Sequence, residues 1–130
     1  MQRTKVVTSR PGFVIDPASV TRTGGVAVDW DNVAADADGN QRLKAGTLLV
    51  EGANGVYPRK EEQGTGKASL ILATDADKDS HTDSLTGYGA YRGGYFYKTL
   101  LPDSGEANFD TWLGELGAMF AFDDYKDVKA

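Results

Sequence analysis

The sequence predicts a small, β-rich α+β domain with one short amphipathic helix, at about residues 104–116, and an extended N-terminal arm. Three observations support this prediction. The length of 130 residues suits one domain with a modest core. The 16 glycines favour a turn-rich β architecture over a helical bundle. Helical spacing of apolar residues is clear in one stretch, which ends near residue 116.

The composition excludes several classes of protein. The chain has no cysteine, so disulfides and thiolate metal sites are excluded. No apolar run approaches the roughly 20 residues that span a bilayer, and no signal segment opens the chain. The net charge of −5 argues against non-specific binding to nucleic acid. We therefore expect a soluble protein with neither a membrane nor a nucleic acid as partner.

Residues 1–25 are predicted to form the arm, and residues 26–130 the domain. The apolar pieces Val6-Val7-Thr8 and Phe13-Val14-Ile15 are too short to form a sheet alone, but each could pair with the sheet edge of another chain. Residues 1–22 hold four basic residues and one acid (+3), so the remainder of the −5 chain carries −8. This distribution indicates an acidic partner surface; a disordered tail with solvated charges is the alternative.

Alternation and turn residues predict the strands in the first half of the domain. Residues 26–30 and 46–51 read as strands. Asn54-Gly55 suits the turn of a hairpin, because an Asn-Gly pair tolerates positive φ. The strand that returns from this turn contains Pro58, which cannot donate to a ladder, so we expect an edge or bulged strand there.

The second half of the domain is predicted to contain the core. The apolar residues 68–74 indicate a central strand, and the aromatic residues 85–97 indicate a strand pair with a glycine bulge. For the helix, Asp103-Ser104 offers an N-cap. Its apolar residues fall on one face, which we expect to pack on the core: Phe109, Trp112, Leu113 and Leu116. A last strand is expected at residues 118–122.

The acidic loops do not form a recognisable site. Residues 31–41 lack the glycine and glutamate positions of a calcium loop and are predicted to be a surface turn. Residues 75–83 alternate carboxylates, but Lys78 interrupts them, so we expect a solvated loop rather than a metal site. His81, the one histidine, has no neighbouring nucleophile or ligand. The sequence therefore predicts no enzyme, cofactor or metal.

Four pieces in this order resemble the head decoration proteins of tailed bacteriophages, the family of the lambda decoration protein. The pieces are the first hairpin (residues 46–57), the strand with its acidic loop (residues 70–83), Gly94-Tyr95-Phe96-Tyr97 followed by Leu100-Leu101-Pro102, and the helix with the last strand. The resemblance covers about residues 43–122. Each motif is short, so their order and spacing carry the resemblance.

The resemblance implies a structural virion protein, synthesised in the host cytoplasm, that binds the outside of the expanded phage head. Members of the family are capsid-stabilising, or cement, proteins. They bind as homotrimers at three-fold sites of the major capsid (coat) protein and clamp its subunits against the pressure of the internal DNA. In members of the family, the N-terminal arm reaches the capsid and pairs with a sheet of the coat protein. Here the arm is longer than in the compact members, and residues 31–41 look like an extra loop.

Two sets of residues follow as candidates for these contacts. The predicted capsid-binding residues lie in the arm: Arg3, Lys5, Val6, Val7, Arg10, Phe13, Val14 and Ile15. The residues predicted for a trimer seam or the core lie in the aromatic segment and the helix: Tyr95, Phe96, Tyr97, Leu101, Pro102 and Trp112.

Two other functions are considered beside this one. A carbohydrate- or host-surface-binding module would use exposed aromatics as a platform: Tyr88, Tyr91, Tyr95 and Trp112. A hydrolase would need two carboxylates at a fixed separation in different environments, and the loop of residues 75–83 offers neither feature. The direction in which the aromatics point separates the first of these alternatives from a decoration protein.

Overall fold

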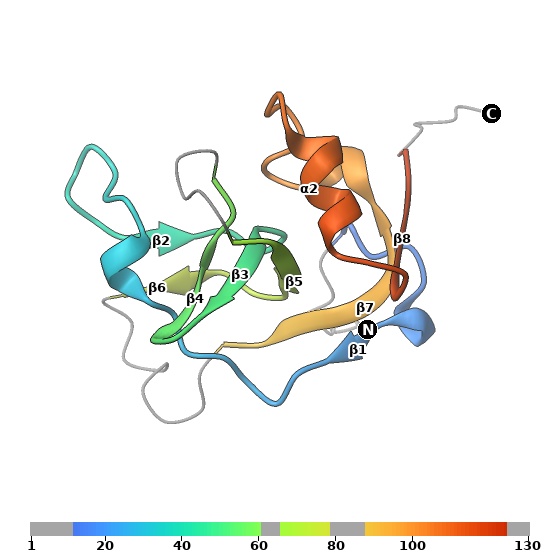
Figure 1. The fold of residues 1–130 in the computed structure, drawn as a ribbon, viewed down its shortest axis with the longest axis horizontal. Helices are drawn as coiled ribbons and strands as arrows, with labels where there is room; N and C mark the ends of the chain where they lie inside the picture. Colours follow the sequence, from blue (N-terminus) through green and yellow to red (C-terminus); the bar gives the residue numbers. More distant parts are fainter. Residues whose placement is uncertain (1–11, 61–65, 79–87, 125–130) are drawn as a thin grey trace, which may run out of the picture.

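The computed structural model describes residues 12–60, 66–78 and 88–124, and the fold is the predicted β-rich α+β domain with one α-helix in that part of the chain (Figure 1). The main sheet contains, in spatial order, β1 (Thr21–Arg22), β7 (Ala90–Tyr97), β5 (Ala68–Leu72), β3 (Leu48–Gly52) and β4 (Gly55–Pro58), with β8 (Phe120–Asp123) also beside β7. A separate pair consists of β2 (Arg42–Leu43) and β6 (Ala76–Asp77). The helical elements are η1 (Pro17–Ser19), η2 (Trp30–Asn32), η4 (Lys98–Leu100) and α2 (Phe109–Glu115).

The hairpin of β3 and β4 confirms the predicted turn. Gly52 pairs with Gly55, whose φ of 131° is open to glycine and strained for other residues. The strand that contains Pro58 lies at the end of the sheet, as predicted for an edge. Its outer side is covered, because the backbone of Val56 exchanges hydrogen bonds of 2.8 Å with Ala27 and Asp29.

The strand predicted at residues 26–30 is wrong. Val26 and Val28 make only isolated bridges, to Tyr88 and to Val56, and the chain then turns into η2. The alternation that suggested a strand reflects side chains that partly face the core. Val26, Val28 and Trp30 pack against a cluster of buried side chains that includes Leu49 and Leu70. This segment therefore covers the sheet edge without joining the sheet as a strand.

Within its described residues, 88–97, the aromatic segment forms one strand, β7, and not a pair; residues 85–87 of the prediction lie outside the described residues. Its first half pairs with β5 and β1, and its second half pairs with β8. A register shift lies opposite Thr21 and Arg22, where the bulge was expected. A Cβ on Gly93 would lie 2.9 Å from the carbonyl oxygen of Met119, so glycine is what allows the chain before β8 to approach here.

The β7–β8 pair is parallel, because the chain crosses over through η4 and α2 between the two strands. The helix is shorter than the predicted residues 104–116. Turns fill residues 103–108, and Asn108 stands at the N-cap without a side-chain bond. Gly105 disfavours helix in this stretch. Asp103 does not cap the helix; burial raises the pKa of its carboxyl, and its Oδ2 atom has no hydrogen-bond partner.

The core has two clusters of buried side chains. β5 belongs to both, since Ile71 faces one cluster and Leu70 and Leu72 the other. The first cluster contains all four residues of the predicted helix face: Phe109, Trp112, Leu113 and Leu116. It also contains Phe13 and Val14, which are 6% and 5% exposed. Phe13 and Val14, predicted as part of the arm, therefore pack into the core in this structure.

Replacing Gly46 by alanine should destabilise the fold. Gly46 has φ of 95°, and a Cβ there would meet Pro102 Cδ at 2.7 Å and Phe13 Cε2 at 3.0 Å. We expect the free energy of unfolding to fall by about 1–3 kcal/mol, from backbone strain and overpacking together. Urea denaturation of G46A measures this, with G105A as control, because a Cβ on Gly105 meets nothing within 4 Å. An equal effect of the two substitutions would contradict the packing described here.

Candidate interaction surface

The described part of the predicted arm is hydrogen-bonded along β7. Tyr97 donates its backbone N–H to the carbonyl of Phe13 at 2.8 Å, and Ile15 donates to the carbonyl of Tyr95 at 3.0 Å. The backbone N–H of Tyr95 donates to Ser19 Oγ at 3.1 Å. This segment therefore runs along β7 from its C-terminal end, with an isolated bridge at Val14, before the chain joins the sheet as β1.

The predicted capsid-binding residues divide into two groups. Phe13 and Val14 are buried in the core, and Ile15 is half-buried. These first two side chains do not lie on the surface of the domain, because β7 and the first cluster enclose them. The other predicted residues lie outside the described part of the chain: Arg3, Lys5, Val6, Val7 and Arg10.

The six residues predicted for a trimer seam or the core also fall into a buried group and a group with exposed surface. Phe96, Leu101 and Trp112 are core residues, at most 3% exposed. Tyr95 and Tyr97 are half-buried, and Pro102 is exposed. Among these six residues, only the second group has surface that another molecule could contact.

An aromatic platform for carbohydrate is not formed by the four predicted residues. Tyr88, Tyr91 and Trp112 are at most 7% exposed. Tyr88 donates its hydroxyl to the carbonyl of Asp77 at 3.0 Å, and the guanidinium of Arg59 lies over the ring of Trp112, 5.3 Å from its centroid. Tyr95 is the one member of the set with appreciable exposed surface. The burial of the other three removes the observation on which this alternative depended.

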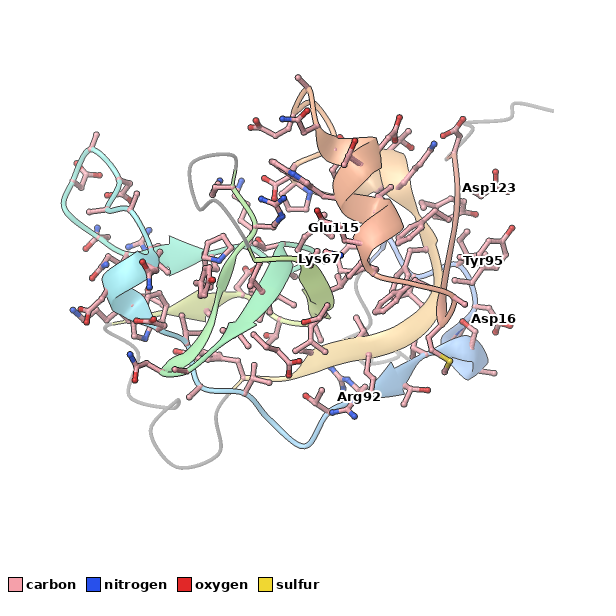
Figure 2. All side chains as sticks on the ribbon, in the orientation of Figure 1. Asp16, Lys67, Arg92, Tyr95, Glu115 and Asp123 are labelled. Carbon is pink, nitrogen blue, oxygen red and sulfur yellow. The ribbon has the colours of Figure 1, made fainter. Side chains whose placement is uncertain are left out.

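The outer side of β8 combines exposed apolar residues with exposed acidic residues, of which Asp123 is labelled in Figure 2. Met119, just before the strand, is 67% exposed, and Ala121 and Asp123 are exposed as well. Tyr95 donates its hydroxyl to Asp123 Oδ2 at 3.1 Å, and this hydrogen bond raises the pKa of Tyr95. Lys98 Nζ lies 3.9 Å from Asp124 Oδ1. Among the described residues β8 pairs only with β7, so its other edge is open.

The acidic residues after β5 have structural partners where they are described. Asp75 accepts a hydrogen bond from the backbone N–H of Ala45 at 2.8 Å, and Asp77 Oδ2 lies 3.4 Å from Arg42 Nε. Within residues 12–60, 66–78 and 88–124 no three potential ligands cluster as a metal site would require. The rest of the predicted acidic loop, with His81, lies outside the described residues.

The Arg59–Glu115 ion pair, which joins α2 to the sheet, is a feature that sequence reasoning missed. Arg59 Nε and Nη2 donate to the two carboxylate oxygens at 2.9 and 3.0 Å, and the backbone N–H of Ala68 donates to Oε1 at 2.8 Å. The hydrogen bond from Arg59 lowers the pKa of Glu115, and the same bond raises the pKa of Arg59. The two residues are far apart in sequence, and no local pattern signals the contact.

Replacing Glu115 by glutamine should destabilise the fold in a pH-dependent way. At neutral pH we expect a loss of about 1–3 kcal/mol, below the value for a fully buried pair because some solvent reaches both groups. The carboxyl has a folded-state pKa below its ordinary 4.5. Its stabilisation is therefore complete above about pH 4.5 and is lost as the pH falls through the folded-state pKa.

Chemical denaturation of wild type and E115Q between pH 3 and 7 tests this expectation. The difference between the two proteins should shrink as the pH falls below about 4.5. Glu51, exposed near the end of β3, provides the control substitution E51Q, for which we expect little loss of stability. A difference that stayed constant over this range would argue against a stabilising carboxylate at position 115.

Comparison with protein-family models, with curated proteins and with solved structures finds no match for this chain. Of the helices in the described residues, none has the length and apolar character needed to cross a membrane.

Proposed function

We propose that this protein is a structural virion protein that decorates the expanded head of a tailed bacteriophage. The observation that supports the proposal is the order of its elements. A hairpin (β3–β4), a buried strand (β5), a Gly-aromatic strand (β7), the Leu101-Pro102 corner, a short helix and a last strand follow one another. This is the order on which the resemblance to head decoration proteins rests.

The arm supplies the capsid contact in this proposal. Because Phe13 and Val14 are core residues, the contact is assigned to the residues that precede them. Those proposed to reach the coat protein are Arg3, Lys5, Val6, Val7 and Arg10. Eleven residues in extended form reach up to about 36 Å, so this segment could contact a surface well beyond the domain.

The charge of the arm favours an acidic partner surface, and a trimer of such arms would favour a shell with repeated sites over a single protein. Three basic residues precede residue 12, on a chain whose net charge is −5, and they would meet an acidic coat surface. A trimer presents three such arms at once, so weak single contacts combine into stable attachment. An arm that becomes ordered only on its site discriminates the expanded shell from the precursor, if expansion exposes that site.

Co-sedimentation with empty heads tests the proposal. Purified protein is mixed with undecorated expanded heads, and separately with unexpanded precursor heads, built from the coat protein of the same genome. We expect saturable binding to the expanded heads and little to the precursor. Absence of binding to expanded heads would contradict the proposal, whatever the oligomeric state of the free protein.

A further inference from the structure

The side of the domain that carries β8 is apolar at one end and acidic at the other. Met119 and Ala121 are exposed, and Asp123 and Asp124 follow at the end of the strand. Lys98 is the one cation within ion-pair distance of these two acids among the described residues, and it is also shared with Asp110 at 3.8 Å. The surface therefore keeps a negative charge at the Asp123 end of an open strand edge, and the exposed methionine lies at the other end, where its backbone oxygen approaches Gly93 of β7. Such a combination suits a partner with cationic side chains.

The side of the domain that carries β1 has the opposite charge. Arg22 lies in β1, and Arg92 lies in β7 within the register shift opposite it; both are exposed. The Arg22 guanidinium lies 5.4 Å from the centroid of the Tyr91 ring. No ion pair with an acid is found for either arginine in the described residues. Two exposed cations on neighbouring strands, without an acid paired to them in the described residues, favour an anionic partner.

These two sides are also the open ends of the main sheet in the described chain. β4 is protected by the segment of residues 27–29, whereas β1 and β8 each pair only with β7. Figure 2 shows Asp123 and Tyr95 along the outer side of β8, and Arg92 at a different side of the molecule, near β1. One molecule thus presents an acidic and a basic surface that face different directions.

We propose that copies of this chain associate head to tail, with the β8 side of one copy against the β1 side of the next. The acidic pair Asp123 and Asp124 of one copy meets Arg22 and Arg92 of its neighbour, and Met119, at the other end of the strand edge, is buried between the two copies. An interface between two different surfaces of the same chain closes into a ring or continues as a filament. The trimeric ring rests on the proposed function, and this arrangement assigns its seam.

The charges also exclude the simplest competing arrangement. If two β8 sides faced each other, four carboxylates would be brought together around a two-fold axis. Two β1 sides would oppose four guanidinium groups. Like charges placed across an interface weaken it by several kcal/mol. The head-to-tail contact is therefore favoured over a symmetric dimer.

A charge-swap experiment tests the seam. D123R/D124R and R22E/R92E each place like charges across the proposed contact, and each should weaken association by about a hundredfold, giving monomers by light scattering where wild type gives trimers. The combined variant carries the reversed charges on both surfaces, so it should restore the trimer. D38R changes a residue of the loop between η2 and β2, an end of the domain that lies far from β8 in Figure 1, and it should leave the trimer intact.

The two double variants should not form closed trimers when mixed, because alternation of two kinds of subunit needs an even number. Circular dichroism confirms that each variant is folded, which is expected since all four residues are exposed. The seam is overturned if both double variants remain trimeric, if the folded combined variant stays monomeric, or if wild type never trimerises. If the variants stay trimeric but no longer bind expanded heads, these charged surfaces contact the coat protein and not a second copy of the chain. The head-binding assay on wild type remains independent of every one of these results.

Discussion

Replacing Phe96 by alanine should lower the free energy of unfolding by about 3–5 kcal/mol. Phe96 has no exposed surface, and its ring lies between 5.4 and 6.1 Å from the ring centroids of four other aromatics. Those four come from different parts of the chain: Phe13, Tyr91, Phe120 and Phe122. The truncation removes the contact that joins the N-terminal segment, β7 and β8, and it leaves a cavity too enclosed to collapse fully.

The measurement is urea denaturation at a fixed protein concentration, since association of copies would otherwise change the apparent stability. A domain of this size has a total stability of about 5–15 kcal/mol, so F96A should be marginally folded. L100A is the matched control, because Leu100 is 43% exposed and should contribute less than about 1 kcal/mol. Comparable losses for the two variants would show that Phe96 is not the centre of the core.

Removal of residues 1–11 should abolish binding to expanded heads and leave the domain folded. In the proposal these residues contact the coat protein and not the core, so the free energy of unfolding should change by less than about 1 kcal/mol. The truncation removes Arg3, Lys5 and Arg10 together with Val6 and Val7. With three arms lost from each trimer, we expect binding to fall at least about a hundredfold.

Removal of residues 1–25 is the matched comparison. This longer truncation also removes Phe13, Val14 and β1, and it exposes the side of β7 that they cover. We expect it to unfold or aggregate, although the sequence alone suggested that the whole of residues 1–25 could be removed. Normal decoration by the shorter truncation would show that the capsid contact lies elsewhere on the domain.

The sequence predicted the elements whose signals are local. Asn54-Gly55 marked the hairpin because that pair suits positive φ, and Gly55 has φ of 131°. Residues 68–74 were predicted to form a central strand because they are mostly apolar, and β5 (Ala68–Leu72) lies in the middle of the sheet. Phe109, Trp112 and Leu113 marked the buried helix face by their spacing, and all three are at most 8% exposed.

The elements that the sequence misplaced depend on contacts between distant residues. Phe13 and Val14 looked like part of a free arm because a three-residue apolar piece has no period. Their burial depends on pairing with Tyr95 to Tyr97, about 80 residues later. The helix start was misplaced because Asp103-Ser104 resembles a cap, whereas the turns after Pro102 use the backbone of both residues.

The candidate surfaces were only partly predictable. Tyr95 was named for a seam and lies on the surface, but Met119 was expected to belong to the last strand and instead precedes it, 67% exposed. The proximity of Arg22 and Arg92 follows from strand pairing across the sheet. No local sequence pattern reports such pairing, so the two charged sides emerged only from the fold.

Cryo-electron microscopy of expanded heads saturated with the purified protein tests whether the protein decorates the outer surface of the head. We expect added density for three copies around each three-fold position, with the segment before residue 12 of each copy extending along the coat protein. Heads that stay bare at saturating protein, or density confined to positions away from the three-fold axes, would contradict this expectation.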